Sequence, residues 1–278
     1  MPYAWTNGFR TYYEDEGEGF PIVFVHGHTF DRTMWEYQVD ALLDEGGYRT
    51  VIMDLRGHGL SEMPITGYWP TSYMQDLRAL LDHLNIQRAV LVGNSVGGSV
   101  VTHFALDYPA RTAALVLAGS GGLGGPPQDP ERIVMHKGMW EVTAARGYLA
   151  AIEEYWIPGP LLRGARKRPE VNDRVKEMVR GYSGQGFRDV RRSTDEPSRS
   201  AEISQIRCPT LIIHGDLDTA DVRSGADLAE RTIPRAQHVV IPDTGHTAML
   251  EEPEAFNQHL LAFLQKALTA DRPPPRRR

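Results

Sequence analysis

The chain has 278 residues, which is enough for one large α/β domain with an insertion or for two small domains. Its 30 Lys and Arg against 36 Asp and Glu give a net charge of −6, which argues against a general nucleic-acid binder. A single cysteine, no apolar run long enough to span a membrane and no readable secretory signal in residues 1–20 predict a cytoplasmic protein without an intrachain disulfide.

Short apolar runs typical of buried strands recur along the chain and alternate with amphipathic stretches. A strand is expected over residues 10–13, and the apolar runs follow at 21–25, 50–53, 89–92, 113–118, 210–213 and 238–241. Apolar residues at helical spacing predict helices over 71–84 and 253–268. Strands that alternate with helices predict an α/β fold with a mostly parallel, doubly wound sheet.

The alternation of strands and helices breaks once, between residues 122 and 208. This stretch is too long for an ordinary connection, and its patterns are helical at 133–145, 148–156 and 171–179. We therefore expect a helical cap inserted over the carboxyl edge of the sheet. The predicted domains are a core of residues 1–121 and 208–270, a cap of residues 122–207 and a disordered Pro- and Arg-rich tail of residues 271–278.

The most informative motif is Gly93-Asn94-Ser95-Val96-Gly97, which directly follows the apolar run at 89–92 and precedes a helix-like segment. A G-x-S-x-G motif between a strand and a helix is typical of a nucleophile elbow. Glycine is needed at its flanks because side chains there would collide in so sharp a turn. The turn lifts the serine hydroxyl above the sheet edge and aims the next backbone N–H groups at the same space.

A base and an acid follow the serine at the ends of two later strands. Serine is a weak nucleophile at neutral pH, so it needs a neighbouring base, and the base needs an orienting group. The strand at 210–213 runs into a turn with Asp216 and Asp218, and the strand at 238–241 runs into His246. The chain order Ser, Asp, His is the one that the elbow architecture uses, with both aspartates as candidates for the acid.

Five segments in order resemble the α/β-hydrolase fold superfamily, and the resemblance covers residues 12–265. They are His26-Gly27-His28, the turn at 54–61, the elbow, the turn at 214–218 and Gly245-His246. The resemblance implies that Ser95 is the nucleophile, that His246 is the general base and that Asp218 orients the histidine, so that Asp216 caps the following turn. It also implies an oxyanion hole made of the backbone N–H groups of Val96 and His28.

Other motifs favour neither a metal nor a cofactor, and we expect none. His26 and His28 form an H-x-H pair, but no further ligands accompany it. Residues 119–124 match G-x-G-x-x-G after a strand, but two prolines follow at once and leave no helix to bind a pyrophosphate. Asp54 belongs to the turn at 54–61, where a structural role is expected.

The cap is expected to decide the substrate, because the fold alone does not. Apolar and aromatic residues of the cap and of the segment after the oxyanion turn are candidates for lining the pocket. They are Phe30, Trp35, Met135, Met139, Trp140, Tyr155 and Trp156. Such a lining suits an uncharged, partly apolar acyl compound of small or medium size, so we expect a serine hydrolase of carboxylic esters or lactones.

Two alternative functions stay open at this point. The stretches at 93–98 and 119–124 resemble the carbon–carbon bond hydrolases that cleave ring-fission products, although these carry H-G-G-G-P-G where this chain has residues 26–31, and a tryptophan where it has Thr247. A small-ligand receptor built on a hydrolase fold would keep the pocket but turn over slowly. The expected partner is a small acyl substrate, with neither nucleic acid nor membrane, and the sequence does not decide between a monomer and a homodimer.

Overall fold

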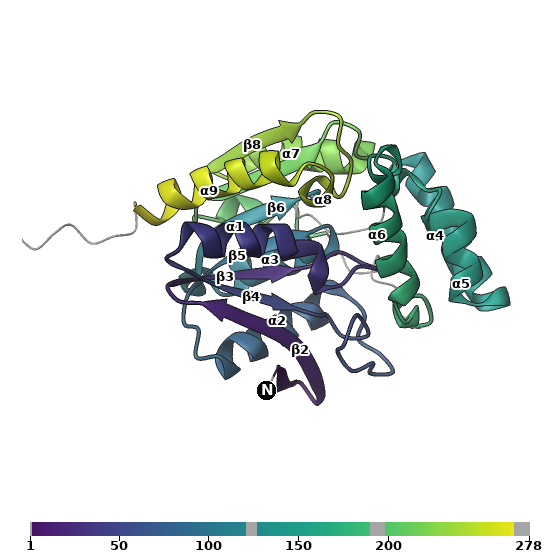
Figure 1. The fold of residues 1–278 in the computed structure, drawn as a ribbon, viewed down its shortest axis with the longest axis horizontal. Helices are drawn as coiled ribbons and strands as arrows, with labels where there is room; N and C mark the ends of the chain where they lie inside the picture. The colour runs from purple at the N-terminus through teal and green to yellow at the C-terminus, as the bar shows by residue number, and fades with distance from the viewer. Residues whose placement is uncertain (1, 121–126, 190–197, 270–278) are drawn as a thin grey trace, which may run out of the picture.

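The computed structural model describes residues 2–120, 127–189 and 198–269. Within these residues, eight strands form one sheet in the spatial order β1-β2-β4-β3-β5-β6-β7-β8 (Figure 1). The first two pairs in this order are antiparallel and the remaining pairs are parallel. The strands are β1 (Tyr3–Thr6), β2 (Phe9–Gly17), β3 (Phe20–Val25), β4 (Tyr48–Met53), β5 (Ala89–Asn94), β6 (Thr112–Ala118), β7 (Thr210–Gly215) and β8 (Ala236–Ile241).

Helices cover both faces of this sheet. One face carries α1 (Glu36–Glu45), α8 (Ala248–Glu251) and α9 (Pro253–Thr269), and the other carries α2 (Pro70–His83), α3 (Val96–Asp107) and α7 (Ala220–Thr232). Successive side chains of a strand point to opposite faces, so each strand serves two cores. In β3, Ile22 and Phe24 pack into one core, whereas Val23 and Val25 pack into the other.

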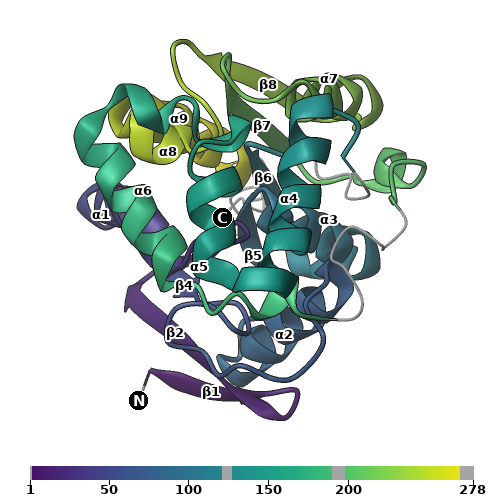
Figure 2. The same cartoon turned by 90° about the vertical axis from the view of Figure 1, so that its right-hand side faces the viewer.

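The segment between β6 and β7 forms a separate group of helices, which we call the helical insertion (residues 127–189). It contains α4 (Pro130–Arg146), α5 (Tyr148–Ala151) and α6 (Pro169–Gly181). Figures 1 and 2 show these helices standing together beyond one end of the sheet. Helix α5 continues directly into a π-helical turn, η3 (Ile152–Trp156).

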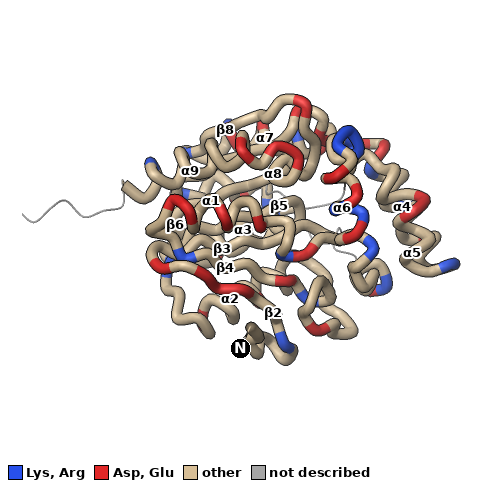
Figure 3. Tube along the Cα trace, viewed as in Figure 1, with Lys and Arg blue, Asp and Glu red and all other residues tan. Residues whose placement is uncertain are grey.

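Ion pairs join the helical insertion to the rest of the molecule. The segment before α6 carries several basic residues, which form the blue group beside α6 in Figure 3. Among them, Lys167 pairs with Asp243, and Arg168 pairs with Glu252 at the start of α9. These partners lie on either side of the turn that contains His246, so the insertion contacts the segment that carries the candidate base.

The fold class predicted from the sequence is confirmed, as is each predicted strand. The short strand β1 was not predicted, because four residues with alternating burial give little signal. The prediction of a buried strand at 238–241 is wrong in its burial. Strand β8 lies at the sheet edge, where Val240 is 46% exposed. The single helix expected over 148–156 is instead α5 followed by the π-helical turn.

Some predictions fall on parts of the chain that are not described. The tail at 271–278 and residues 121–124 of the glycine-rich stretch lie outside the described residues. Among the helices of the described residues, none is long and apolar enough to cross a membrane.

A buried ion pair connects the first hairpin, the turn after β4 and helix α2. Arg56 donates from Nε and Nη2 to the carboxylate of Asp76 at 2.7 and 2.6 Å. Asn7, in the turn between β1 and β2, donates to the same carboxylate at 2.8 Å. The Asp76 side chain is fully buried and that of Arg56 is 11% exposed, so water can replace neither partner.

Asp76→Ala is therefore expected to lower the free energy of unfolding by about 3–5 kcal/mol, because it leaves a buried guanidinium without its carboxylate partner. Asp82→Ala on the same helix is the matched control. Its pair with Arg111 lies at the surface, with Asp82 53% exposed, and should cost less than about 1 kcal/mol. Urea unfolding of both variants measures the difference, and equal losses would contradict this account.

Candidate active site

Ser95 lies in a strained turn between the end of β5 and the start of α3. Its backbone has φ 53° and ψ −116°, a conformation that residues with a side chain rarely adopt. A Cβ at Gly93 would collide with the carbonyl oxygen of Gly97, and a Cβ at Gly97 would collide with that of Val25. The two glycines of the motif are therefore required because backbone passes directly against backbone on both sides of Ser95.

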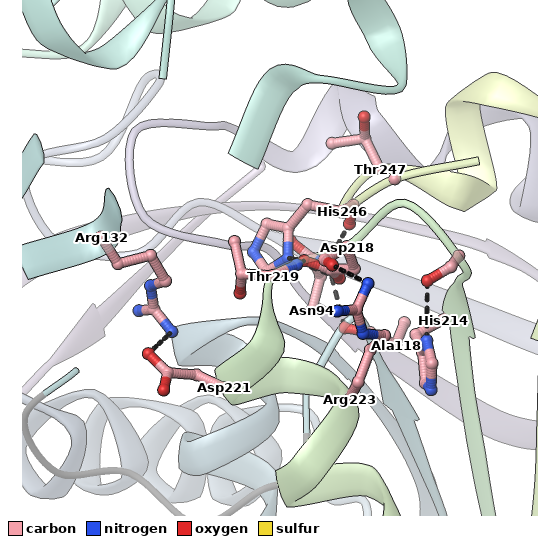
Figure 4. A network of polar contacts seen from close by, with 12 residues as sticks. Asn94, Ala118, Arg132, His214, Asp218, Thr219, Asp221, Arg223, His246 and Thr247 are labelled. Carbon is pink, nitrogen blue, oxygen red and sulfur yellow. Dashed lines mark hydrogen bonds and ion pairs between the residues drawn. The ribbon is translucent and has the colours of Figure 1, made fainter. Parts of the chain in front are cut away.

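His246 and Asp218 lie together, as Figure 4 shows. The Nδ1 atom of His246 is 2.9 and 3.1 Å from the two carboxylate oxygens of Asp218. A carboxylate only accepts, so Nδ1 carries the proton and Nε2 is left to accept one. This Nε2 atom is buried without a hydrogen-bond partner among the described residues, and His246 lines the same cavity as Ser95.

The side chain of Asn94 links the turn at Ser95 to the His246 segment. Its Nδ2 donates to the carbonyl oxygens of Ala118 at 3.0 Å and of His246 at 3.2 Å. The backbone N–H of Ser95 also donates to Ala118, at 3.1 Å. The hydrogen bonds of Asn94 and Ser95 thus tie the turn at Ser95 to β6 and to the backbone of His246.

A buried carboxylate, Glu251, holds the backbone on both sides of His246. It accepts hydrogen bonds from the N–H of Gly245 at 2.6 Å, the N–H of Thr247 at 3.2 Å and the hydroxyl of Thr247 at 2.8 Å. Burial raises the pKa of Glu251, and the N–H groups of Gly245 and Thr247 oppose this rise. A Cβ at Gly164 of the helical insertion would collide with the same carboxylate, so the insertion packs closely against it.

The turn after β3 contains the expected second oxyanion donor, His28. The ring of the preceding His26 is fixed at both nitrogens, because Nδ1 donates to the Gly27 carbonyl at 2.8 Å and Nε2 accepts from Leu55 N–H at 2.9 Å. This leaves no ring nitrogen of His26 for a metal ion. His28 and Val96 both line the cavity beside Ser95, and Val96 is the first residue of α3, where backbone N–H groups lack an intrahelical acceptor.

The cavity has a volume of about 580 Å³ and lies between the sheet edge and the helical insertion. On the sheet side it is lined by His28, Ser95, Val96 and His246. On the side of the insertion it is lined by Arg132, His136 and Trp156, among other residues.

Of the seven residues expected from the sequence to line a pocket, Trp156 lies at this cavity and the other six do not. Phe30 and Trp35 are buried in the core below the sheet edge, where the Trp35 ring packs 5.2 Å from that of Phe24. Met135 and Met139 are buried in the same apolar core. Trp140 packs against Phe187, and Tyr155 occupies the space beside Gly138.

The ring of His28 makes aromatic contacts with the helical insertion. Its centroid lies 4.8 Å from that of Phe187, 5.2 Å from Tyr182 and 5.9 Å from Trp156. Burial lowers the pKa of His28 to about 3, and it does the same to His136, which faces Trp156 from α4. Both rings are therefore neutral at pH 7.

The remaining candidates lie outside this group. Asp54 accepts from the backbone N–H groups of Arg32 and Leu60, each at 2.8 Å, as expected of a structural residue. The carboxylate that binds Nδ1 of His246 is that of Asp218 and not that of Asp216. Among the described residues, Asp227, Glu230 and His238 of α7 and β8 are close enough to share a metal ion, but none of the three lines the cavity.

Asn94, Arg132, His136 and Glu251 are site residues that the sequence reasoning did not assign. Asn94 stands inside the serine motif, so the sequence places it next to Ser95. The sequence does not show that its side chain binds the carbonyl oxygens of Ala118 and His246. Glu251 lies five residues after His246, and no local pattern indicates that its side chain turns back.

Comparisons with known proteins agree with this geometry. The family model described as alpha/beta hydrolase fold matches residues 21–253. A solved esterase from Thermogutta terrifontis, described as malate bound, has a TM-score of 0.82 and 30% identity, covering 96% of this chain and 97% of its own. The enol-lactonase from Burkholderia xenovorans LB400 has a TM-score of 0.81 and 25% identity, covering 95% and 100%.

Two curated relatives carry other names. The 2-hydroxy-6-oxononadienedioate/2-hydroxy-6-oxononatrienedioate hydrolase of Paraburkholderia phymatum is 30% identical over 92% of this chain and 91% of its own length. The non-heme haloperoxidase of Rhodococcus erythropolis is 27% identical over 95% and 100%. The chain thus belongs to the alpha/beta hydrolase fold family, whose members among these matches carry several different activities.

Glu251→Gln is expected to loosen the segment around His246, because an amide offers one accepting oxygen where the carboxylate offers two. Amide hydrogen exchange at Gly245 and Thr247, measured by NMR, should become about ten- to a hundredfold faster. Glu252→Gln is the control, because Glu252 is 43% exposed and pairs with Arg168 at the surface. Equal exchange in the two variants would show that Glu251 does not hold this segment.

The lowered pKa of His136 predicts how stability depends on pH. The unfolded chain binds a proton near the ordinary pKa of 6.5, whereas the folded protein binds it near 3. The free energy of unfolding should therefore fall as the pH falls from 6.5 towards 3. His136→Gln should flatten this dependence in urea titrations at pH 7 and pH 4.5, whereas Gln at the exposed His259 should leave it unchanged. An unchanged slope in His136→Gln would rule out this source of acid sensitivity.

Proposed function

We propose that the protein is a serine hydrolase that cleaves a carboxylic ester or lactone through an acyl-enzyme on Ser95. The observation that carries this proposal is the joint placement of Ser95 and the unpartnered Nε2 of His246 at one cavity, with Nδ1 of His246 bound to Asp218. The esterase and the enol-lactonase among the similar structures support the same class of reaction.

In the first half of the proposed reaction, the hydroxyl oxygen of Ser95 attacks the acyl carbon while Nε2 of His246 takes its proton. Asp218 holds the ring orientation and stabilises the imidazolium that forms. The negative charge on the carbonyl oxygen is stabilised by the backbone N–H groups of Val96 and His28. Collapse of the tetrahedral intermediate breaks the ester bond, and the imidazolium delivers its proton to the departing alcohol.

In the second half, water attacks the acyl-enzyme and gives its proton to the same nitrogen of His246. The second tetrahedral intermediate collapses, Ser95 regains its proton and the carboxylic acid leaves. The helical insertion acts as a cap in this proposal, because Arg132, His136 and Trp156 form the opposite wall of the cavity.

Carbon–carbon bond hydrolysis is the second candidate function, and the relative from Paraburkholderia phymatum favours it by name. The pair His28-Thr29 favours ester hydrolysis, because the carbon–carbon hydrolases that the sequence resembles carry glycines at these two positions. Activity against short 4-nitrophenyl esters compared with a vinylogous 1,5-diketone separates the two reactions.

Labelling with a fluorophosphonate tests the nucleophile. The protein should be labelled once, and Ser95→Ala should abolish labelling and lower ester turnover by about a millionfold. Ser204→Ala, at an exposed position outside the cavity, is the control. Retained labelling in Ser95→Ala would overturn the proposal.

Paired substitutions test the acid. Asp218→Asn should lower kcat by about ten-thousandfold, because the amide favours the wrong histidine tautomer. Asp216→Asn, two residues away, should have a much smaller effect on the same ester assay. A larger loss in Asp216→Asn would mean that the acid has been misassigned.

A further inference from the structure

One wall of the cavity is polar. Arg132 and His136 stand one turn apart on α4, so their side chains share a helix face, and both line the cavity with Ser95. The charged residues among the described lining are Arg132, Arg231 and Asp221. These three side chains sum to one positive charge at the lining, and the carboxylates of Asp218 and Asp129 also act on Arg132. An anionic ligand would therefore bind Arg132 through direct charged hydrogen bonds rather than through a positive field of the whole cavity.

Arg132 is only partly satisfied by its partner. Asp221 approaches it at 3.4 Å (Figure 4), which is long for a charged hydrogen bond. The carboxylate of Asp221 instead accepts closer bonds from the backbone N–H of Asp129 at 2.8 Å and of Gln128 at 3.1 Å. The Arg132 side chain is 20% exposed, and its Nε is buried without a hydrogen-bond partner among the described residues.

His136 offers a second unused polar group on the same wall. Its ring is neutral at pH 7, and its Nε2 is buried without a hydrogen-bond partner among the described residues. The ring of Trp156 meets it edge to face at 5.9 Å and limits its orientation. A guanidinium and an imidazole with free groups, set beside the candidate nucleophile, form a site for a planar anion.

We propose that Arg132 binds a carboxylate carried by the ester or lactone substrate, away from the scissile bond, with a hydrogen bond from His136. This assignment rests on the proposed function and replaces the uncharged substrate expected from the sequence. Six of the seven apolar residues behind that expectation do not line the cavity, whereas the charged residue Arg132 does. The enzyme would then act on half-esters or lactones of dicarboxylic acids.

The competing explanation is that Arg132 only ties the helical insertion to α7 through Asp221. The two explanations predict opposite results for Asp221→Asn. If the ion pair is a structural tie, this variant should resemble Arg132→Gln. If Arg132 binds substrate, removal of Asp221 frees the guanidinium and should maintain or raise the preference for a charged substrate.

The test compares two six-carbon esters that differ in one end group, mono-4-nitrophenyl adipate and 4-nitrophenyl hexanoate. The ratio of their kcat/KM values should exceed ten in the wild type and fall about ten- to a hundredfold in Arg132→Gln. Arg132→Lys should give an intermediate ratio, since it retains the charge without the planar fork. Arg146→Gln, at the exposed end of the same helix, should change the ratio less than twofold.

Protection against fluorophosphonate labelling gives a second readout that needs no turnover. Adipate should slow the labelling of wild-type Ser95 but not that of Arg132→Gln, with thermal unfolding showing that both are folded. Suppose that the wild type is labelled and cleaves the hexanoate, but that Arg132→Gln changes neither the ratio of kcat/KM values nor the protection by adipate. This result would overturn the inference and leave the proposed function standing. Equal loss of the ratio in Asp221→Asn and Arg132→Gln would also overturn it, whereas absence of labelling would remove the proposed function itself.

Discussion

The site depends on one constraint, the left-handed backbone at Ser95. Backbone atoms lie so close on both sides of the turn that neither Gly93 nor Gly97 can carry a Cβ. This conformation is unfavourable for serine in isolation, so the surrounding sheet and helix α3 must hold it. The result is a side chain that lines the cavity and stands at the start of helix α3, where backbone N–H groups lack an intrahelical acceptor.

The segment around His246 is held from three directions that converge on the same few residues. Asp218 binds its ring, Asn94 binds its carbonyl oxygen, and Glu251 binds the N–H groups beside it. Because Glu251 also contacts Gly164, the packing of the helical insertion reaches the backbone of the proposed base. Precise placement of the proposed proton acceptor is therefore a property of the whole edge of the sheet rather than of three side chains.

The helical insertion divides its side chains between two tasks. Its apolar residues, such as Met135 and Met139, join the main core and fix the insertion to the sheet. Its polar residues Arg132 and His136 face the cavity, where burial keeps the imidazole neutral. Part of the shape and charge of the cavity is thus set by a segment that is separate in sequence from the proposed nucleophile, acid and base.

The sequence by itself determined most of the order of strands and helices, the serine turn, and the placement of His246 and of two candidate acids, Asp216 and Asp218, after later strands. These features follow from local patterns, since apolar periodicity and glycine spacing act over a few residues. Only the tertiary structure decided that Trp156 faces the cavity while Trp35 lies in the core, and that Glu251 and Arg132 reach the site. In the helical insertion, some side chains pack in the core and others line the cavity. Which of the two a side chain does depends on neighbours far away in the chain, and no local pattern records this.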